Sequence, residues 1–291
     1  MTTPGNHPKP RAWRCAFFLT LLLVLAAAPA WAQAPAAPPP PLAVEIFAHR
    51  GHHVMAPENS LAALGAAVDL GLQGSEIDLR TTRDGRVVLM HDADLARTSD
   101  GRGPLSGRSL TELRRLRLKD ANGRLTEERI PTLDEALDLV KAQPGFRLVL
   151  DLKQVDAAQV ARQVRQKGMA GQVVFFIADP QDVALARAIH AAGPELILAV
   201  DLLGWWKIEG LARFAAHAIQ AKALFASEWF FPRCGFAEAK EAGAEVMVYL
   251  WGDHDLPARL GRAAALGAAV VSSDRPDLII NLVRPRRGAD K

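Results

Sequence analysis

The sequence predicts an α/β protein, a (β/α)8 TIM barrel with a small insertion after strand two. Three observations predict this fold. From residue 42 onward, short β-branched runs alternate eight times with stretches of helical periodicity, which is the pattern of a parallel sheet covered by helices. The length from residue 42 to residue 291 is close to the ~250 residues of one such barrel. Glycines separate five of the predicted helices from the strands that follow them: Gly71, Gly168, Gly193, Gly243 and Gly267.

The elements follow one another in regular order. Runs rich in β-branched and apolar residues predict strands over 44–49, 74–80, 147–152, 172–178, 195–201, 223–228, 245–250 and 268–272. Apolar residues at helical spacing predict helices over 60–70, 132–142, 156–167, 182–192, 208–220, 236–242, 256–266 and 277–283. Each helix except the last stands between two strands, so the strands are expected to run parallel.

One segment interrupts this alternation. Residues 86–92 form an additional extended run after the turn Asp84-Gly85. A polar, Arg-rich excursion follows and ends before Ile130-Pro131. We interpret residues 93–130, approximately, as an insertion that covers part of the site.

The first 32 residues are predicted to be a signal peptide. An apolar run over 16–28 follows three cations, and Ala30-Trp31-Ala32 supplies the small residues of a cleavage site. The run is too short for a comfortable transmembrane helix, so cleavage after Ala32 and export to the periplasm or the medium are expected, with no integral membrane segment afterwards. Residues 33–41 are Ala/Pro-rich and read as an extended linker, and residues 42–291 form the catalytic barrel domain.

The charge balance argues against nucleic acid as a partner. The whole chain has 35 Lys+Arg and 32 Asp+Glu. Because the predicted signal peptide contains Lys9, Arg11 and Arg14 and no acid, the remaining chain has 32 of each. Cys234 is the one cysteine after residue 32, so no internal disulfide is expected.

Polar side chains follow several predicted strands, as in a barrel that builds one site from several strand ends. Glu76 and Asp78 share one face of a strand, as do Asp151 and Lys153, because residues two apart point to the same side. Converging carboxylates suit Ca²⁺ or Mg²⁺, whereas the single Cys and the lack of Cys/His spacing disfavour zinc. The alternative is a solvated strand end with turn-favouring acids.

The histidines and cations near these acids suggest phosphodiester chemistry. His49 and His91 are candidates for general acid and base, although a lone histidine at a strand end is more often structural. Arg50 and Lys153 suit a phosphate, or else they pair with neighbouring acids. Three roles remain open for Glu58: a neighbour of the metal, a residue that orients His49, or an acid ahead of the first helix.

Several motifs resemble the glycerophosphodiester phosphodiesterase family. They are Phe47-Ala48-His49-Arg50-Gly51, Ala56-Pro57-Glu58-Asn59-Ser60, Glu76-Ile77-Asp78-Leu79, Thr82-Arg83-Asp84-Gly85, His91-Asp92, Leu95-Ala96-Arg97-Thr98, Ile130-Pro131-Thr132-Leu133 and Ser273-Asp274-Arg275-Pro276. The resemblance extends from about Ile46 to the C-terminus. It implies a TIM barrel that hydrolyses glycerophosphodiesters to sn-glycerol 3-phosphate and an alcohol with the help of a divalent cation.

The resemblance also implies roles for individual residues. His49 and His91 would be the acid–base pair, and Glu76 and Asp78 would bind the cation. Arg50 would hold the phosphate, with Glu58 beside the site. The family usually has Glu-x-Lys where this chain has Asp151-Leu152-Lys153, so a shorter carboxylate supplies the expected third metal ligand.

The aromatic residues suggest how the alcohol group is selected. Four tryptophans and the single tyrosine lie at or just after predicted strand ends: Trp205, Trp206, Trp229, Trp251 and Tyr249. We expect Trp205, Trp229, Tyr249 and Trp251 to contact the substrate, with glycerophosphocholine or a lysophospholipid as candidates, through contacts worth roughly 0.5–2 kcal/mol per ring for a cation. Ordinary packing at the barrel rim is the equal alternative.

Two other functions are compatible with the sequence. One is a phosphodiesterase that acts on lysophospholipids or sphingolipids and releases a cyclic phosphate. The other is a non-catalytic surface protein that binds through its aromatic rim. Two polar residues and a proline receive no central role: His53 is interpreted as a loop residue, and Asp274 with Pro276 as the entry into the last helix.

Overall fold

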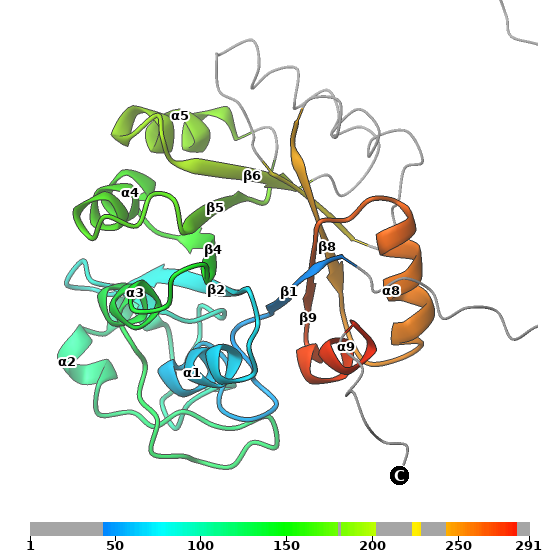
Figure 1. The fold of residues 1–291 in the computed structure, drawn as a ribbon. Helices are drawn as coiled ribbons and strands as arrows, with labels where there is room; N and C mark the ends of the chain where they lie inside the picture. Colours follow the sequence, from blue (N-terminus) through cyan, green and yellow to red (C-terminus); the bar gives the residue numbers. More distant parts are fainter. Residues whose placement is uncertain (1–42, 180–181, 202–222, 228–242, 284–291) are drawn as a thin grey trace, which may run out of the picture. The chain divides into compact units, whose positions relative to one another are not determined.

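The computed structural model describes residues 43–179, 182–201, 223–227 and 243–283 (Figure 1). Within these residues one sheet contains the strands β1 (Glu45–Ala48), β2 (Gly74–Thr81), β4 (Arg147–Gln154), β5 (Val173–Ile177), β6 (Ile197–Asp201), β7 (Ala223–Ser227), β8 (Glu245–Leu250) and β9 (Val270–Ser273). They pair in parallel in the order β1-β9-β8-β7-β6-β5-β4-β2, and β1 also pairs with β2. The described strands therefore close on themselves, which confirms the predicted barrel fold.

Helices follow the strands and pack on the outer face of the sheet (Figure 1). They are α1 (Leu61–Asp69), α3 (Leu133–Lys141), α4 (Ala157–Gln166), α5 (Val183–Ala192), α8 (Leu256–Ala265) and α9 (Pro276–Val283). Side chains cap the first turn of several of them, as when Ser60 accepts from the Ala63 amide and Thr132 forms a capping box with Glu135. The predicted helices over 208–220 and 236–242 lie outside the described residues. No helix in the described ranges is both long enough and apolar enough to cross a bilayer.

The alternation of side chains along each strand separates two apolar regions. On β8, Met247 and Tyr249 point into the barrel, whereas Val248 and Leu250 pack against the helices. At the amino ends of the strands, Arg147 fills the barrel interior and forms ion pairs with two glutamates, Glu45 and Glu245. Apolar residues and this ion-pair group fill the barrel interior toward the amino ends of the strands. The polar inward side chains therefore lie at the carboxyl ends of the strands.

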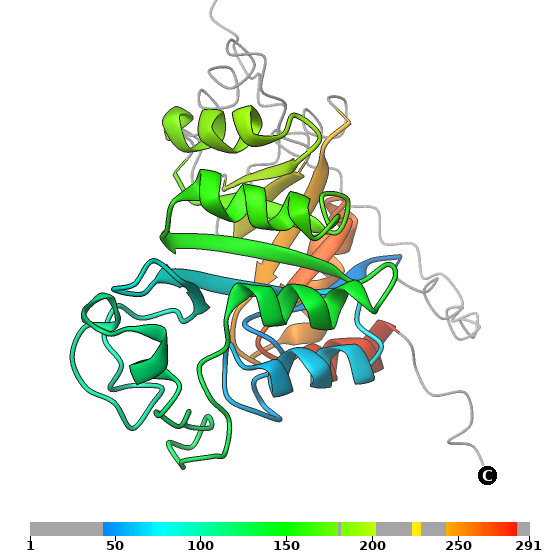
Figure 2. The same cartoon turned by 90° about the vertical axis from the view of Figure 1, so that its left-hand side faces the viewer.

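The segment between β2 and α3 has a small core of its own. β3 (Val87–Leu89) pairs antiparallel with β2, and the short helices η1 (Leu105–Gly107) and α2 (Leu110–Leu113) follow it (Figure 2). Its buried apolar residues form a separate cluster: Val88, Met90, Leu95, Leu105, Leu113, Leu118 and Ile130. Because β3 joins the barrel directly, this segment holds the residues just after β3 next to the end of β2.

Candidate active site

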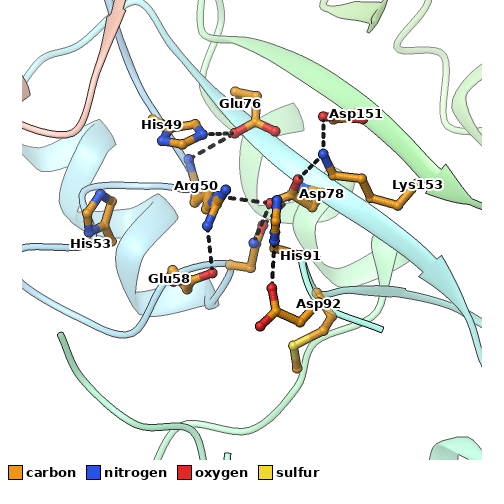
Figure 3. Close-up of polar contacts among 12 residues, drawn as sticks. His49, Arg50, His53, Glu58, Glu76, Asp78, His91, Asp92, Asp151 and Lys153 are labelled. Carbon is orange, nitrogen blue, oxygen red and sulfur yellow. Dashed lines mark hydrogen bonds and ion pairs between the residues drawn. The ribbon is translucent and has the colours of Figure 1, made fainter. Parts of the chain in front are cut away.

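Three carboxylates converge at the carboxyl ends of β2 and β4 (Figure 3). Parallel pairing sets Asp78 directly beside Asp151, and Glu76 precedes Asp78 by two residues on the same face. One oxygen from each of the three lies within 4.8 Å of the others. Burial, together with the charges of Asp78 and Asp151, raises the pKa of Glu76 well above its usual range. Burial also raises the pKa of Asp151, although Lys153 opposes it. These oxygens fit a hard divalent cation, which would relieve their mutual repulsion.

Two cations face this cluster. Lys153 Nζ lies 2.6 Å from Asp151 Oδ2 and 3.3 Å from Asp78 Oδ1. Arg50 Nε lies 3.3 Å from Asp78 Oδ2. Burial lowers the pKa of Lys153, but the neighbouring carboxylates overcome this and raise it, so the ammonium stays charged. The alternative in which Arg50 and Lys153 pair with acids therefore holds in this structure.

Asn59 fixes the most buried of these acids. Its Nδ2 donates to Asp78 Oδ2 at 2.8 Å, and its Oδ1 accepts the Asp78 amide at 3.0 Å. The backbone of Asn59 has a φ of +56°, a left-handed conformation in which Asn is better tolerated than most residues. Its amide also donates to the carbonyl of Arg50. The Asn of the Pro-Glu-Asn motif thus orients a carboxylate and closes the loop after β1.

The loop after β1 needs glycine at position 51. Gly51 has a φ of +78°, and a Cβ on it would lie 2.6 Å from the Cβ of Ala63 in α1. This close approach lets the Gly51 amide donate to Ser75 Oγ, while the Arg50 amide donates to Glu76 Oε2 at 3.1 Å. Backbone donors and a tight turn therefore attach the His-Arg-Gly motif to β2.

His49 is held by Asp274, an aspartate that the sequence places just ahead of the last helix. That helix begins at Pro276, and Asp274 lies between β9 and the helix with Oδ1 2.7 Å from His49 Nδ1. Although burial opposes it, hydrogen bonds from the two histidines His49 and His53 hold the pKa of Asp274 far below its usual range. An ionised carboxylate only accepts, so Nδ1 carries the proton. The other ring nitrogen, Nε2, lies 3.7 Å from Glu76 Oε2.

His91 has a similar partner. It follows β3, and its Nδ1 lies 2.6 Å from Asp92 Oδ1. Hydrogen bonds from Arg97 hold the pKa of Asp92 far below its usual range, so this carboxylate also accepts the Nδ1 proton. The ring lies close enough to Asp151 that an imidazolium at this position would lower the pKa of that carboxyl. Arg80 donates to the His91 carbonyl at 2.7 and 2.8 Å and fixes the backbone there.

Glu58 links the two halves of the site. It accepts from Arg97 Nη1 and Nη2 at 2.6 and 2.8 Å and from Arg50 Nη1 at 3.1 Å. Burial raises its pKa, but these arginines outweigh burial and lower it. Among the described residues, its hydrogen bonds and ion pairs join it to the two arginines, and none joins it to His49. Arg97, in turn, ties Glu58 to Asp92.

One of the predicted aromatic residues, Tyr249, lies beside His49 and stacks on a second, Trp251. The Tyr249 and Trp251 ring centroids are 5.4 Å apart with planes 5° apart, and the Tyr249 and His49 rings stand at 71° to each other with centroids 5.9 Å apart. Tyr249 is buried, whereas Trp251 is 37% exposed. Trp205 and Trp229 lie outside the described residues.

Sequence reasoning missed two acids that lie at inward positions. Asp274 continues the inward series Val270, Ser272 on β9, and Asp201 occupies the last position of β6 and is buried. Both follow the same alternation that identified Glu76 and Asp78. Applying that rule to every strand end would have found them.

Comparisons with known proteins agree on one family. The sequence model of the glycerophosphoryl diester phosphodiesterase family matches residues 49–278. The glycerophosphodiester phosphodiesterase of Caldanaerobacter subterraneus is 39% identical over 112 residues, which are 37% of this chain and 44% of that protein. The match thus spans less than half of the curated relatives' length.

Solved structures match over most of the chain. A glycerophosphodiester phosphodiesterase from Agrobacterium tumefaciens superposes with a TM-score of 0.68 at 28% identity, covering 82% of this chain and 99% of that one. An Oleispira antarctica phosphodiesterase, solved in complex with the product sn-glycerol-3-phosphate, superposes with a TM-score of 0.66 at 25% identity, covering 82% and 96%.

Proposed function

Because the chain belongs to the glycerophosphoryl diester phosphodiesterase family, we propose that it hydrolyses glycerophosphodiesters to sn-glycerol 3-phosphate and an alcohol. One observation carries the proposal: three carboxylates converge within 4.8 Å beside an imidazole that an aspartate orients. The relative from Oleispira antarctica that holds sn-glycerol-3-phosphate supports glycerol phosphate as the product.

A divalent cation, Ca²⁺ or Mg²⁺, is proposed to bind Glu76, Asp78 and Asp151. Charge supports this, because three carboxylates face two cations, Arg50 and Lys153, which leaves one negative charge. A divalent ion would turn this into one positive charge, which matches the single negative charge of a phosphodiester. When bound, such an ion would neutralise a phosphoryl oxygen and acidify the adjacent glycerol hydroxyl.

His49 and His91 are proposed as the acid–base pair. Each ring donates its Nδ1 proton to an aspartate, which leaves the Nε2 lone pair available for proton transfer. One ring takes the proton of the attacking hydroxyl and the other gives a proton to the departing alcohol oxygen. Arg50 and Lys153 hold the phosphate during this exchange. Attack of the glycerol hydroxyl on phosphorus with loss of the alcohol would leave a cyclic glycerol phosphate. Water then opens this ring to glycerol phosphate, as the family resemblance implies.

A second candidate, a phosphodiesterase of lysophospholipids that releases a cyclic phosphate, is favoured by the apolar surface near His49. The loop that follows His49 exposes Val54 at 44% and Met55 at 71%, and Trp251 is 37% exposed. Such side chains suit an acyl chain or another apolar alcohol group. Phosphorus NMR of the products decides between the two, because free glycerol phosphate supports hydrolysis and a persistent cyclic phosphate supports this second candidate.

The central experiment measures turnover of glycerophosphocholine and glycerophosphoglycerol by the purified protein. Chelation with EDTA should abolish activity, and adding back Ca²⁺ or Mg²⁺ should restore it. His49→Ala or His91→Ala should lower turnover on the order of 10²-fold or more. His190→Ala, on α5, is the matched control and should retain activity. Near-normal turnover in either site variant would remove the acid–base assignment, and no hydrolysis under any condition would favour a non-catalytic barrel.

The glycerophosphocholine panel also tests the aromatic side chains. If Tyr249 and Trp251 bind the alcohol group, Trp251→Ala should change the ratio of the two diesters' kcat/KM values. An unchanged ratio leaves rim packing as their role. Trp205 and Trp229 remain predictions.

Export is the remaining proposal. The predicted signal peptide supports release of a mature chain that begins at Gln33. Cell fractionation with N-terminal sequencing tests this, and a product that retains residues 1–32 in the cytoplasm would contradict it.

A further inference from the structure

Two imidazoles share one carboxylate beside the acid cluster. Asp274 Oδ1 lies 2.7 Å from His49 Nδ1 and 3.2 Å from His53 Nε2. The two rings stand nearly perpendicular, with centroids 6.4 Å apart (Figure 3). One donor atom from each of the three residues lies within 4.8 Å of the others. Their side chains are 14%, 24% and 27% exposed, so an ion can reach them.

We propose that His49, His53 and Asp274 bind a zinc ion, and that this ion inhibits the hydrolysis proposed above. Two imidazole nitrogens and one carboxylate form a donor set typical of zinc with one open position. Ligand atoms around zinc at ~2.0–2.1 Å stand roughly 3.3 Å apart in a tetrahedron, so the cluster needs only a small opening. The all-oxygen cluster of Glu76, Asp78 and Asp151 instead suits a harder cation.

The surroundings support this ligand set. The Gly252 amide donates to Asp274 Oδ2 at 3.1 Å, so it holds the carboxylate with Oδ1 toward both histidines. Glu76 lies 3.7 Å from His49 Nε2, where a carboxylate can accept the second ring proton of a metal-bound imidazole. Sequence spacing gave no zinc pattern because the third ligand follows β9, more than two hundred residues from His49.

Zinc binding and catalysis exclude each other through the tautomer of His49. Without zinc, Nδ1 donates to Asp274 and Nε2 has a free lone pair. Coordination through Nδ1 moves the proton to Nε2, so the ring no longer has a lone pair for the proton of a substrate. His53 contributes to zinc binding without taking part in the proposed reaction.

Binding is tested on the full protein, stripped with EDTA and kept in saturating Mg²⁺. Calorimetric titration with Zn²⁺ and the visible absorption of Co²⁺ should both report one site. His53→Gln should weaken zinc binding by about 100-fold or more, because it removes a direct ligand. His190→Gln, at the far end of α5, and Asp151→Asn, in the acid cluster, should leave it unchanged. Equal zinc affinity in wild type and His53→Gln, or loss of binding in Asp151→Asn, would overturn the site.

Activity tests the inhibition, which rests on the proposed function. Zinc at its measured dissociation constant should halve the turnover of the wild type in Mg²⁺, whereas His53→Gln should keep its activity. Equal inhibition of both proteins, or zinc binding with unchanged turnover, would overturn the inhibitory role. A wild type inactive without zinc would contradict the proposed function instead, and the binding titration would still decide the zinc site.

Discussion

Replacing Asp274 with Asn tests whether a carboxylate sets the protonation state of His49. The Gly252 amide donates to Oδ2, so the carbonyl oxygen of the new amide must occupy that position. The amide nitrogen then takes the place of Oδ1 and faces His49 Nδ1. Because this nitrogen only donates, Nδ1 must accept, and the ring proton moves to Nε2. The substitution keeps the shape of the side chain and reverses the tautomer.

The expected loss follows from the bond that is broken. The distance from Nδ1 to Oδ1 is 2.7 Å, which is short and typical of a charge-assisted hydrogen bond. Both side chains are largely buried, and such a bond contributes about 1.5–3 kcal/mol. At 1.36 kcal/mol for each tenfold change, kcat should fall by at least roughly 10- to 150-fold. KM should change little, because Asp274 is not expected to touch the phosphate.

The assay is steady-state hydrolysis of glycerophosphocholine with saturating Mg²⁺ in zinc-free buffer. Asp277→Asn is the matched control, since Asp277, in the first turn of α9, forms its ion pair with Arg275 and not with His49. The control should retain turnover, and circular dichroism should show both variants folded. A kcat for Asp274→Asn within about threefold of wild type, or an equal loss in the control, would refute this reasoning.

Three further variants test the loop, the ion-pair network and the acid cluster. Gly51→Ala should destabilise the fold by about 1–3 kcal/mol in chemical denaturation, because of its positive φ and its 2.6 Å approach to α1; Gly85→Ala has a φ of +75° without a clash and should cost less. Arg97→Gln should lower the free energy of unfolding by about 1–2 kcal/mol at pH 7, discounted because Arg97 is 47% exposed. Arg97 lowers the folded pKa of both Glu58 and Asp92, so this contribution is present above their unfolded pKa values and is lost as pH falls through the folded ones, first that of Glu58 and then that of Asp92. A difference between wild type and variant that does not shrink as pH falls would contradict the assignment. Asp151→Asn should weaken Mg²⁺ binding by about tenfold or more in calorimetry, with Asp151→Glu near wild type, and equal affinity in the Asn variant would remove the third ligand.

Periodicity was enough for most of the fold because it records which face of an element is buried. The expected strand over 245–250 matches β8, and the expected helix over 182–192 differs from α5 by one residue. The extended run expected over 86–92 is shorter in the structure, where only the three residues of β3 pair with β2. The sequence also identified Glu76, Asp78 and Asp151 as inward residues at strand ends, because inward and outward side chains alternate along a strand.

The sequence did not predict which side chains contact each other across the barrel. The sequence left three roles open for Glu58, and none of them included its partner Arg97, 39 residues away. Asp274 was interpreted locally, as a residue ahead of a helix. Alternation along β9 marks Asp274 as an inward residue, but neither its contact with His49 nor that of Glu58 with Arg97 has a local signal, since each depends on which strand ends and loops meet.

The sequence by itself determined the alternation of strands and helices, the motifs that resemble one family, and the side of each strand on which an acid stands. Only the tertiary structure decided that Asp274 completes a pair of imidazoles and that Asp78 lies beside Asp151. The reason is physical: local pattern reflects burial along one element, whereas these contacts depend on strand register and barrel closure, which join residues far apart in the chain.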